Sequence, residues 1–278
     1  MTAISPVGSR DARIEDPSNL LIIHPAARAL LPLALRLRIS ANAVSVTGMA
    51  LGLAAAAAYT HWADWRFSTM GFLLMVGWLV TDGLDGMVAR ATNSSSALGR
   101  LLDGVCDHVV FVSVYCMIAF MIGTVEGWAL AIVAGAAHAW QSNFYESERA
   151  RFHRRARGDG GEDRPARTGN LLDRGYEALS RSIDGLSAPI DEALRGARAP
   201  EALGQAYGAC AAAPLKLQSL LSANVRVLAI YVACLLGNPR FFWWFEIAPL
   251  TAVLIIGLLW HRQTISSLLA PATAGAGT

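Results

Sequence analysis

The sequence predicts an all-α integral membrane protein with six transmembrane helices, and two observations carry this prediction. Hydrophobic residues make up 54% of the 278 residues and charged residues only 16%, whereas soluble domains carry about a quarter charged residues. Six apolar stretches also approach the ~20 residues that a helix needs to cross the hydrocarbon core of a bilayer. These stretches are residues 42–59, 67–88, 98–122, 128–144, 221–236 and 241–260.

The basic residues predict the orientation of these spans. All but two of the 23 Lys and Arg residues fall on one side of the predicted membrane, and the exceptions are Arg66 and Arg240. Because basic loops stay inside, we expect a multi-pass protein of the inner (cytoplasmic) membrane with both termini in the cytoplasm. Aromatic residues at the opposite ends of the spans agree with this orientation. A net charge of only +2 argues against a nucleic-acid partner.

The remaining segments complete the expected domain organisation. Residues 1–41 form a cytoplasmic N-terminus, 42–147 hold spans one to four, 148–220 form a basic and amphipathic cytoplasmic insertion, 221–262 hold spans five and six, and 263–278 form a cytoplasmic tail. An interfacial amphipathic helix is expected over residues 24–38, interrupted at Pro32. Within the insertion, we expect residues 149–169 to be flexible and residues 172–194 to form an amphipathic helix.

Four aspartates stand where charged residues are costly, at the inner ends of the second and third spans. Asp82 and Asp85 share one helix face, and Asp103 and Asp107 share another. An ionisable residue within a span costs about 2.5 kcal/mol or more, so four carboxylates require a compensating partner. Two adjacent antiparallel helices would direct all four at one point. Oxygen-only ligands favour Mg²⁺ or Mn²⁺, and two such ions ~3.5–4 Å apart are the arrangement used for phosphoryl-type displacements.

Small and basic residues surround these aspartates. Gly83, Gly86, Gly99 and Gly104 carry no side chain, so a bulky ligand could approach the backbone closely. Arg90 could neutralise an acid or bind a phosphate. In the first span, Gly48 and Gly52 form a GxxxG pattern, for which we expect an internal helix contact rather than a dimer interface.

The motif Asp82-x2-Asp85-Gly86-x2-Ala89-Arg90-x8-Gly99-x3-Asp103-x3-Asp107 resembles the signature of the CDP-alcohol phosphotransferase family at every fixed position. The similarity is clearest over residues 39–120 and includes the run ISANAVSVTG before and within the first span. The resemblance implies a six-helix membrane enzyme, usually a homodimer, that joins a CDP-linked group to an alcohol and releases CMP. Its active site would open to the cytoplasmic leaflet.

The resemblance also implies roles for individual residues. Asp82, Asp85 and Asp103 would be metal ligands. Asp107 would contact the second metal and accept the proton of the attacking hydroxyl. The cytidine diphosphate end of the site would be lined by Gly86, Ala89, Arg90 and Gly99.

Two kinds of substrate are compatible with this family. In one, CDP-diacylglycerol donates a phosphatidyl group to a small polar alcohol; in the other, CDP-choline or CDP-ethanolamine donates to a lipid acceptor. Arg149 and Arg226, at the inner ends of later spans, could clamp the phosphate of an anionic acceptor. The sequence therefore favours inositol phosphate or glycerol phosphate as the acceptor. The run Asn93-Ser94-Ser95 resembles the choline and ethanolamine enzymes, but Asn and Ser are common in any turn.

Two other classes of function fit the aspartates less well. An ion-coupled transporter would place acids near mid-membrane and often shows repeat symmetry between its halves, and neither feature is present in the sequence. A lipid pyrophosphate phosphatase would use the same two metals but release inorganic phosphate rather than CMP.

Overall fold

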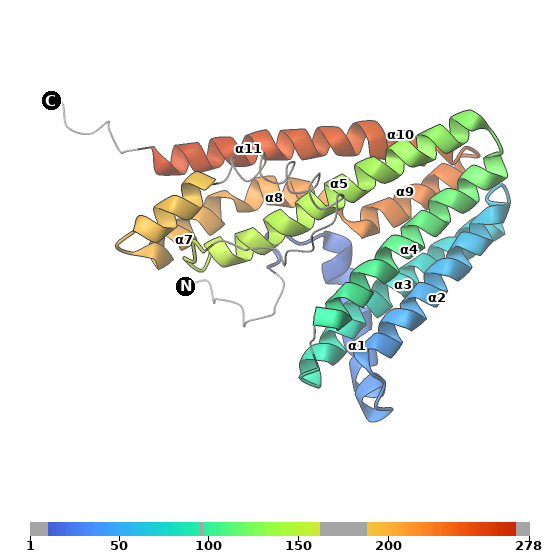
Figure 1. The fold of residues 1–278 in the computed structure, drawn as a ribbon, viewed down its shortest axis with the longest axis horizontal. Coiled ribbons are helices and arrows are strands. Elements are labelled where there is room, and N and C mark those ends of the chain that lie inside the picture. The colour runs from blue at the N-terminus through green and yellow to red at the C-terminus, as the bar shows by residue number, and fades with distance from the viewer. Residues whose placement is uncertain (1–10, 95–96, 162–187, 271–278) are drawn as a thin grey trace. The chain divides into compact units, whose positions relative to one another are not determined.

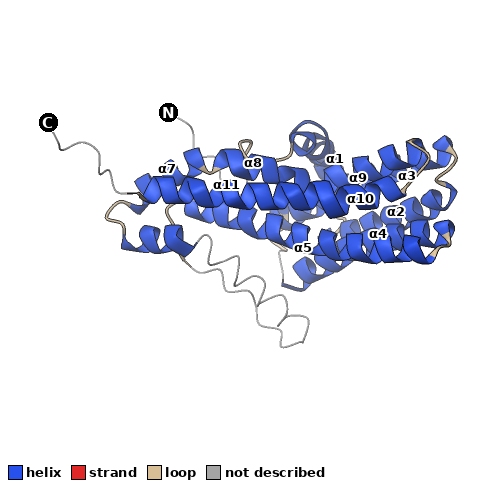
Figure 2. Cartoon of the chain, turned by 90° about the horizontal axis from the view of Figure 1, so that it is seen from above, coloured by secondary structure: helices blue, strands red, loops and turns tan. Residues whose placement is uncertain are grey.

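The computed structural model describes residues 11–94, 97–161 and 188–270. Throughout these ranges every regular element is a helix (Figure 2), which confirms the predicted all-α class. The chain divides into two compact units. We call Asp16–Trp140 with Leu221–Thr251 the motif unit, and Met1–Glu15 with Gln141–Leu220 and Ala252–Thr278 the insertion unit.

The motif unit is built around α2, which packs against both α3 and α4 (Figure 1). Helices α1 and α9 also pack against α3. The unit comprises η1 (Asn19–Ile23), α1 (His24–Arg36), α2 (Ala41–Ala58), η2 (Tyr59–His61), α3 (Trp65–Ala91), α4 (Ala97–Ile122), the first half of α5 (Val125–Arg155), α9 (Ala223–Leu235), α10 (Arg240–Phe245) and η4 (Glu246–Leu250).

Short polar side chains begin the central helices. The Ser40 hydroxyl accepts a hydrogen bond from the Ala43 amide, and the Asp64 carboxylate accepts one from the Arg66 amide. Each cap satisfies a backbone N–H that has no partner within its helix. Asn93 follows the end of α3 with a φ of +51°, opposite in sign to helical values, a conformation that Asn adopts more readily than most residues.

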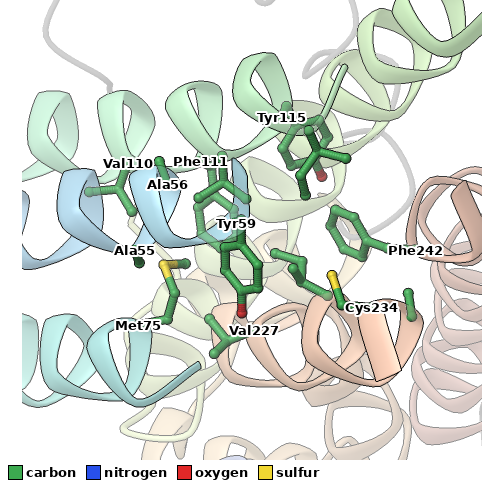
Figure 3. Packing of buried hydrophobic residues seen from close by; sticks show 14 of the residues in the cluster. Ala55, Ala56, Tyr59, Met75, Val110, Phe111, Tyr115, Val227, Cys234 and Phe242 are labelled. Atoms are coloured by element: carbon green, nitrogen blue, oxygen red, sulfur yellow. The ribbon is translucent and has the colours of Figure 1, made fainter. Parts of the chain in front are cut away.

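A continuous apolar core joins the helices of the motif unit. Figure 3 shows Tyr59, Met75, Val110, Phe111 and Val227 packed together from η2, α3, α4 and α9. All five are nearly inaccessible to solvent. Because this core is shared by four elements, it fixes the rotation of α3 and α4, the helices that carry the aspartates.

The two glycines of α2 allow close helix packing. A Cβ atom at Gly48 would lie 2.5 Å from Thr81 Oγ1 of α3, and one at Gly52 would lie 2.3 Å from Val110 Cγ2 of α4. Only glycine fits at such distances. The prediction of an internal helix contact at this GxxxG pattern is therefore confirmed.

The insertion unit has its own core. It contains the second half of α5, helical residues 188–196, α7 (Pro200–Cys210), α8 (Ala212–Gln218) and most of α11 (Thr251–Leu269). Ile190 and Leu194, from the expected amphipathic helix, are buried here with Phe152, Tyr207 and Ile265. Most of that expected helix lies outside the described residues.

The segment expected to be flexible from Arg149 is instead helical at its start, because α5 continues to Arg155. Charged pairs one turn apart stabilise this extension: Arg149 pairs with Glu146 at 2.9 Å, and Arg151 with Glu148 at 2.7 Å. The helix ends before Gly158, which has a φ of 84°. Residues 162–169 lie outside the described part of the chain.

Four helical segments in the described ranges are long and apolar enough to cross a membrane, or five if a bent pair counts as one span. They are Ala41–His61, Trp65–Ala91, Gly104–Ile122 and Arg240–Leu269, with Ala212–Leu221 and Ala223–Leu235 as the bent pair. Helix α5, which holds the predicted fourth span, is not among them because its apolar half includes Glu126, His138 and Gln141. The count of six spans stays a prediction.

The expected N-terminal helix is present as α1. Ala27 and Ala34 are buried and belong to one core cluster with Leu84 and Val88 of α3, while leucines on other faces are exposed. The helix continues through Pro32 to Arg36, so the interruption predicted at Pro32 is wrong. Its location at a membrane surface stays a prediction.

Candidate active site

Two of the predicted metal ligands lie toward the C-terminal end of α3. Asp85 is buried, with 6% of its surface exposed, and Asp82 is half-buried one turn earlier. Gly83, between them, contacts Ala27 and Ile23 at the α1 side: a Cβ there would lie 3.6 Å from the Ala27 Cβ. The N-terminal helix thus packs directly beside the first two aspartates.

An aromatic contact relates α3 to α4 at the level of the motif. The rings of Trp78 and Phe111 meet edge to face, with centroids 5.3 Å apart. The two helices run in opposite directions (Figure 1). Asp82 lies four residues after Trp78, and Asp107 lies four residues before Phe111. Each aspartate is therefore about one helical turn beyond the contact, on the same side of it.

The remaining aspartates lie on α4. Asp107 is half-buried. Asp103 lies one turn earlier in the same helix, but its side chain is outside the described part of the structure. Gly104 lies between them, and among the described residues, its chain neighbours and own helix backbone aside, no atom lies within 4 Å of a Cβ built on it. Space is therefore available beside the α4 aspartates.

Ser45 of α2 holds Asp85, and the sequence analysis did not identify it. Its hydroxyl donates a hydrogen bond to Asp85 Oδ2 at 2.6 Å, and both side chains are buried. Ser45, Gly48 and Gly52 lie one turn apart, so the face of α2 that contacts Asp85 also packs against Thr81 and Val110. The sequence signal for Ser45 is the run ISANAVSVTG, which by itself predicts only the start of a span.

The residues predicted to bind cytidine diphosphate follow Asp85 on α3. Arg90 is exposed, and its guanidinium lies over Gly86, where a Cβ would be 3.3 Å from the nearer terminal nitrogen. Ala89 and Gly99 are half-buried. An exposed guanidinium beside a glycine offers hydrogen-bond donors to a phosphate that can approach the backbone.

The donor set fits a hard divalent cation. Asp82, Asp85 and Asp107 offer carboxylate oxygens, which Mg²⁺ and Mn²⁺ prefer, and the space at Gly104 leaves room for a ligand. Among the described side chains, which exclude Asp103, no group of three or more His, Cys, Asp or Glu residues is close enough to hold a metal. The four-carboxylate, two-metal cluster stays a prediction.

Comparison with known families bears on this site directly. The sequence model of the family described as CDP-alcohol phosphatidyltransferase matches residues 38–153, which include all four aspartates, Ser45 and both glycines of α2. This part of the chain is therefore similar to the CDP-alcohol phosphatidyltransferase family. The resemblance found from the motif is thereby confirmed.

Curated proteins similar to this chain match only part of it. Cholinephosphotransferase 1 of Danio rerio is 53% identical over 49 residues, which are 17% of this chain and 13% of that protein. Cholinephosphotransferase 1 of Gallus gallus is 37% identical over 78 residues, 27% and 23% of the two chains. Ethanolaminephosphotransferase 1 of Pongo abelii is 41% identical over 59 residues, 21% and 15%. The matched segments thus span less than a quarter of these relatives.

The two arginines predicted to bind the acceptor both have carboxylate partners. Arg226 of α9 is fully buried, and its Nε donates a hydrogen bond to Glu246 Oε1 at 2.8 Å. A terminal nitrogen of Arg226 also donates to the Leu221 carbonyl. Arg149, in the insertion unit, pairs with Glu146 and with Glu15. A phosphate clamp formed by these arginines stays a prediction.

Proposed function

We propose that this chain transfers a phospho-alcohol group, of the phosphocholine or phosphoethanolamine type, from a CDP-linked donor to the hydroxyl of a lipid acceptor, with release of CMP. The observation that carries the proposal is the family motif on α3 and α4, together with the similarity of this chain to curated proteins named cholinephosphotransferase and ethanolaminephosphotransferase. This is the alternative substrate logic of the sequence analysis, and it replaces inositol phosphate or glycerol phosphate as the favoured acceptor.

The buried ion pair of Arg226 supports a neutral acceptor. Its guanidinium already donates to the Glu246 carboxylate at 2.8 Å, and both side chains are fully buried. An acceptor phosphate at this position would have to displace a buried carboxylate, which would then be left without its cation. A neutral lipid hydroxyl would not need to displace the Glu246 carboxylate.

The aspartates would bind the metal and carry out the proton transfer. Asp82, Asp85, Asp103 and Asp107 would hold two Mg²⁺ or Mn²⁺ ions, which supply positive charge to the pyrophosphate when bound. Asp107 accepts the proton of the acceptor hydroxyl. The acceptor oxygen then forms a bond to the phosphorus that carries the small alcohol. The bond from that phosphorus to the bridging oxygen breaks, and CMP leaves with that oxygen.

The residues after Asp85 would orient the donor. Arg90 would bind the cytidine-linked phosphate, while Gly86, Ala89 and Gly99 would allow close approach of the nucleotide to the backbone. Holding the donor and the acceptor oxygen in line accounts for much of the rate in such a displacement.

The membrane setting supports a lipid substrate. Four or five apolar helices suggest a multi-pass membrane protein, and we propose six spans, cytoplasmic termini, an active site at the cytoplasmic leaflet of the inner membrane and a homodimer.

Cysteine accessibility at Arg66 and at Arg100 would test the orientation. We expect a membrane-impermeant thiol reagent added outside intact cells to label Arg66→Cys only, and labelling of Arg100→Cys instead would reverse the orientation.

A donor-exchange assay tests the substrate assignment. Purified protein in lipid–detergent micelles with Mg²⁺ receives either CDP-choline and CDP-ethanolamine with diacylglycerol, or CDP-diacylglycerol with inositol phosphate, glycerol phosphate, inositol and serine. We expect acceptor-dependent CMP in the first mixture. CMP in the second mixture alone would restore the phosphatidyl-transfer assignment, and inorganic phosphate without CMP would indicate a phosphatase.

Asp107→Asn is the control for that assay. Because it removes the general base, we expect CMP release to fall by about 10²- to 10⁴-fold while binding of the CDP-linked donor is largely retained. Turnover close to that of the wild type would show that Asp107 is not the base.

A further inference from the structure

We infer that Ser45 is a positioning residue for the metal site, because its hydroxyl fixes the Asp85 carboxylate. This inference rests on the proposed function in one respect, namely that Asp85 binds a divalent cation. Ser45 lies on α2, 40 residues before Asp85, and donates to Oδ2 at 2.6 Å. Both residues are buried, at 7% and 6% exposure.

The hydrogen bond of Ser45 differs from those of three threonines in the helices of the motif unit. Thr47, Thr81 and Thr92 donate to backbone carbonyls of their own helices at 2.7–2.8 Å, which is the usual behaviour of Ser and Thr within a helix. Ser45 has the same option, but the Ala41 carbonyl is at 3.2 Å and the Asp85 carboxylate at 2.6 Å. The shorter, charge-assisted bond is the stronger one, so the hydroxyl links α2 to α3.

The packing of α2 holds this hydroxyl in place. One turn after Ser45, Gly48 brings the α2 backbone so close to Thr81 that a Cβ would lie 2.5 Å from its Oγ1. Thr81 precedes Asp82 and lies one turn before Asp85. The separation of α2 and α3 is therefore set beside the Ser45–Asp85 contact. The donor cannot shift relative to the carboxylate without opening this glycine contact.

A hydroxyl is suited to orienting a metal ligand. It donates one hydrogen bond and adds no positive charge, so the carboxylate keeps the negative charge that attracts a cation. By binding Oδ2, it fixes the plane of the carboxylate and thereby the direction of Oδ1. Removal of such an outer partner of a metal ligand typically costs about 10- to 100-fold in metal affinity or activity.

The test measures metal binding directly, without turnover. Mn²⁺ is titrated into purified protein in detergent, and free Mn²⁺ is followed by electron paramagnetic resonance. For Ser45→Ala we expect Mn²⁺ affinity to fall by about 10-fold or more. Ser45→Thr, which keeps the hydroxyl, restores affinity close to that of the wild type. The matched control is Thr47→Ala, which removes an exposed hydroxyl from the same helix and leaves affinity unchanged.

The outcomes separate this inference from the proposed function. Wild-type affinity in Ser45→Ala overturns the positioning role and leaves the metal site intact. Absence of Mn²⁺ binding in the wild type overturns the metal site and the inference together. If Ser45→Ala does not fold, Ser45→Cys replaces it, because a thiol is of similar size but is a weak hydrogen-bond donor. Wild-type Mn²⁺ affinity in Ser45→Cys would likewise overturn the inference.

Discussion

The family motif and the ion pairs of this molecule hold their carboxylates in different ways. In the insertion unit, Arg155 is 1% exposed and binds Asp191 through two hydrogen bonds of 2.8 and 2.6 Å. In the motif unit, Glu246 is bound by Arg226. Asp85, in contrast, accepts a hydrogen bond from the neutral hydroxyl of Ser45. The arginines neutralise their partners, whereas the serine orients a carboxylate and leaves its charge in place.

The charges of the ion pairs therefore contribute to stability, whereas those of the motif aspartates contribute to metal binding. In a buried ion pair each charge compensates the other, so the loss of one partner leaves an uncompensated charge. A carboxylate held by a neutral hydroxyl receives no opposite charge from that hydroxyl, and a bound cation would favour its charged form. We therefore expect mutations of the ion pairs to reduce stability, and mutations of the motif aspartates to reduce metal binding.

The largest expected effect on stability is that of Arg226→Ala. It leaves Glu246 buried without its guanidinium, so we expect the free energy of unfolding to fall by about 3–5 kcal/mol. Denaturant or thermal unfolding in detergent measures this loss. The double variant Arg226→Met with Glu246→Leu should recover most of it, because apolar side chains can replace a buried pair.

The same variant distinguishes a structural arginine from a substrate clamp. A stable Arg226→Ala protein with a raised acceptor Michaelis constant would contradict the structural role. It would also return the acceptor assignment to an anionic alcohol.

A smaller effect is expected for Gly52→Ala. Its Cβ would lie 2.3 Å from Val110 Cγ2, and overpacking of this kind costs about 1–3 kcal/mol. Val110→Ala should relieve the clash, so the double variant should be more stable than the sum of the single changes predicts. Additive losses, measured by thermal unfolding, would show that α2 and α4 are not in close contact here.

The smallest effect is expected for Arg240→Ala, the matched control for Arg226→Ala. Arg240 pairs with Glu126 at 3.2 Å, but the two side chains are 28% and 61% exposed. Exposed pairs contribute about 0–1 kcal/mol. A loss as large as that of Arg226→Ala would show that burial does not separate the two classes of ion pair.

The sequence predicted the helical class, the internal contact of Gly48 and Gly52, and the family, because each depends on local spacing. The pairing of Arg226 with Glu246 was not predictable, since it depends on how α9 meets η4. The role of Ser45 depends in the same way on the register between α2 and α3. The sequence did not predict the helical extension of α5 past residue 148, because basic composition favours a flexible segment, although Glu146 and Glu148 stand at pairing distance from Arg149 and Arg151.

The central claim is that the motif carboxylates bind a cation, whereas Glu246 serves a structural ion pair with Arg226. Thermal unfolding of the wild type, Asp85→Asn and Glu246→Gln with and without Mg²⁺ tests it most directly. At about 100 times the dissociation constant, Mg²⁺ should stabilise the wild type by about 2.7 kcal/mol. We predict a similar gain for Glu246→Gln, although that protein starts less stable, and little gain for Asp85→Asn. An equal gain in all three proteins would contradict the account.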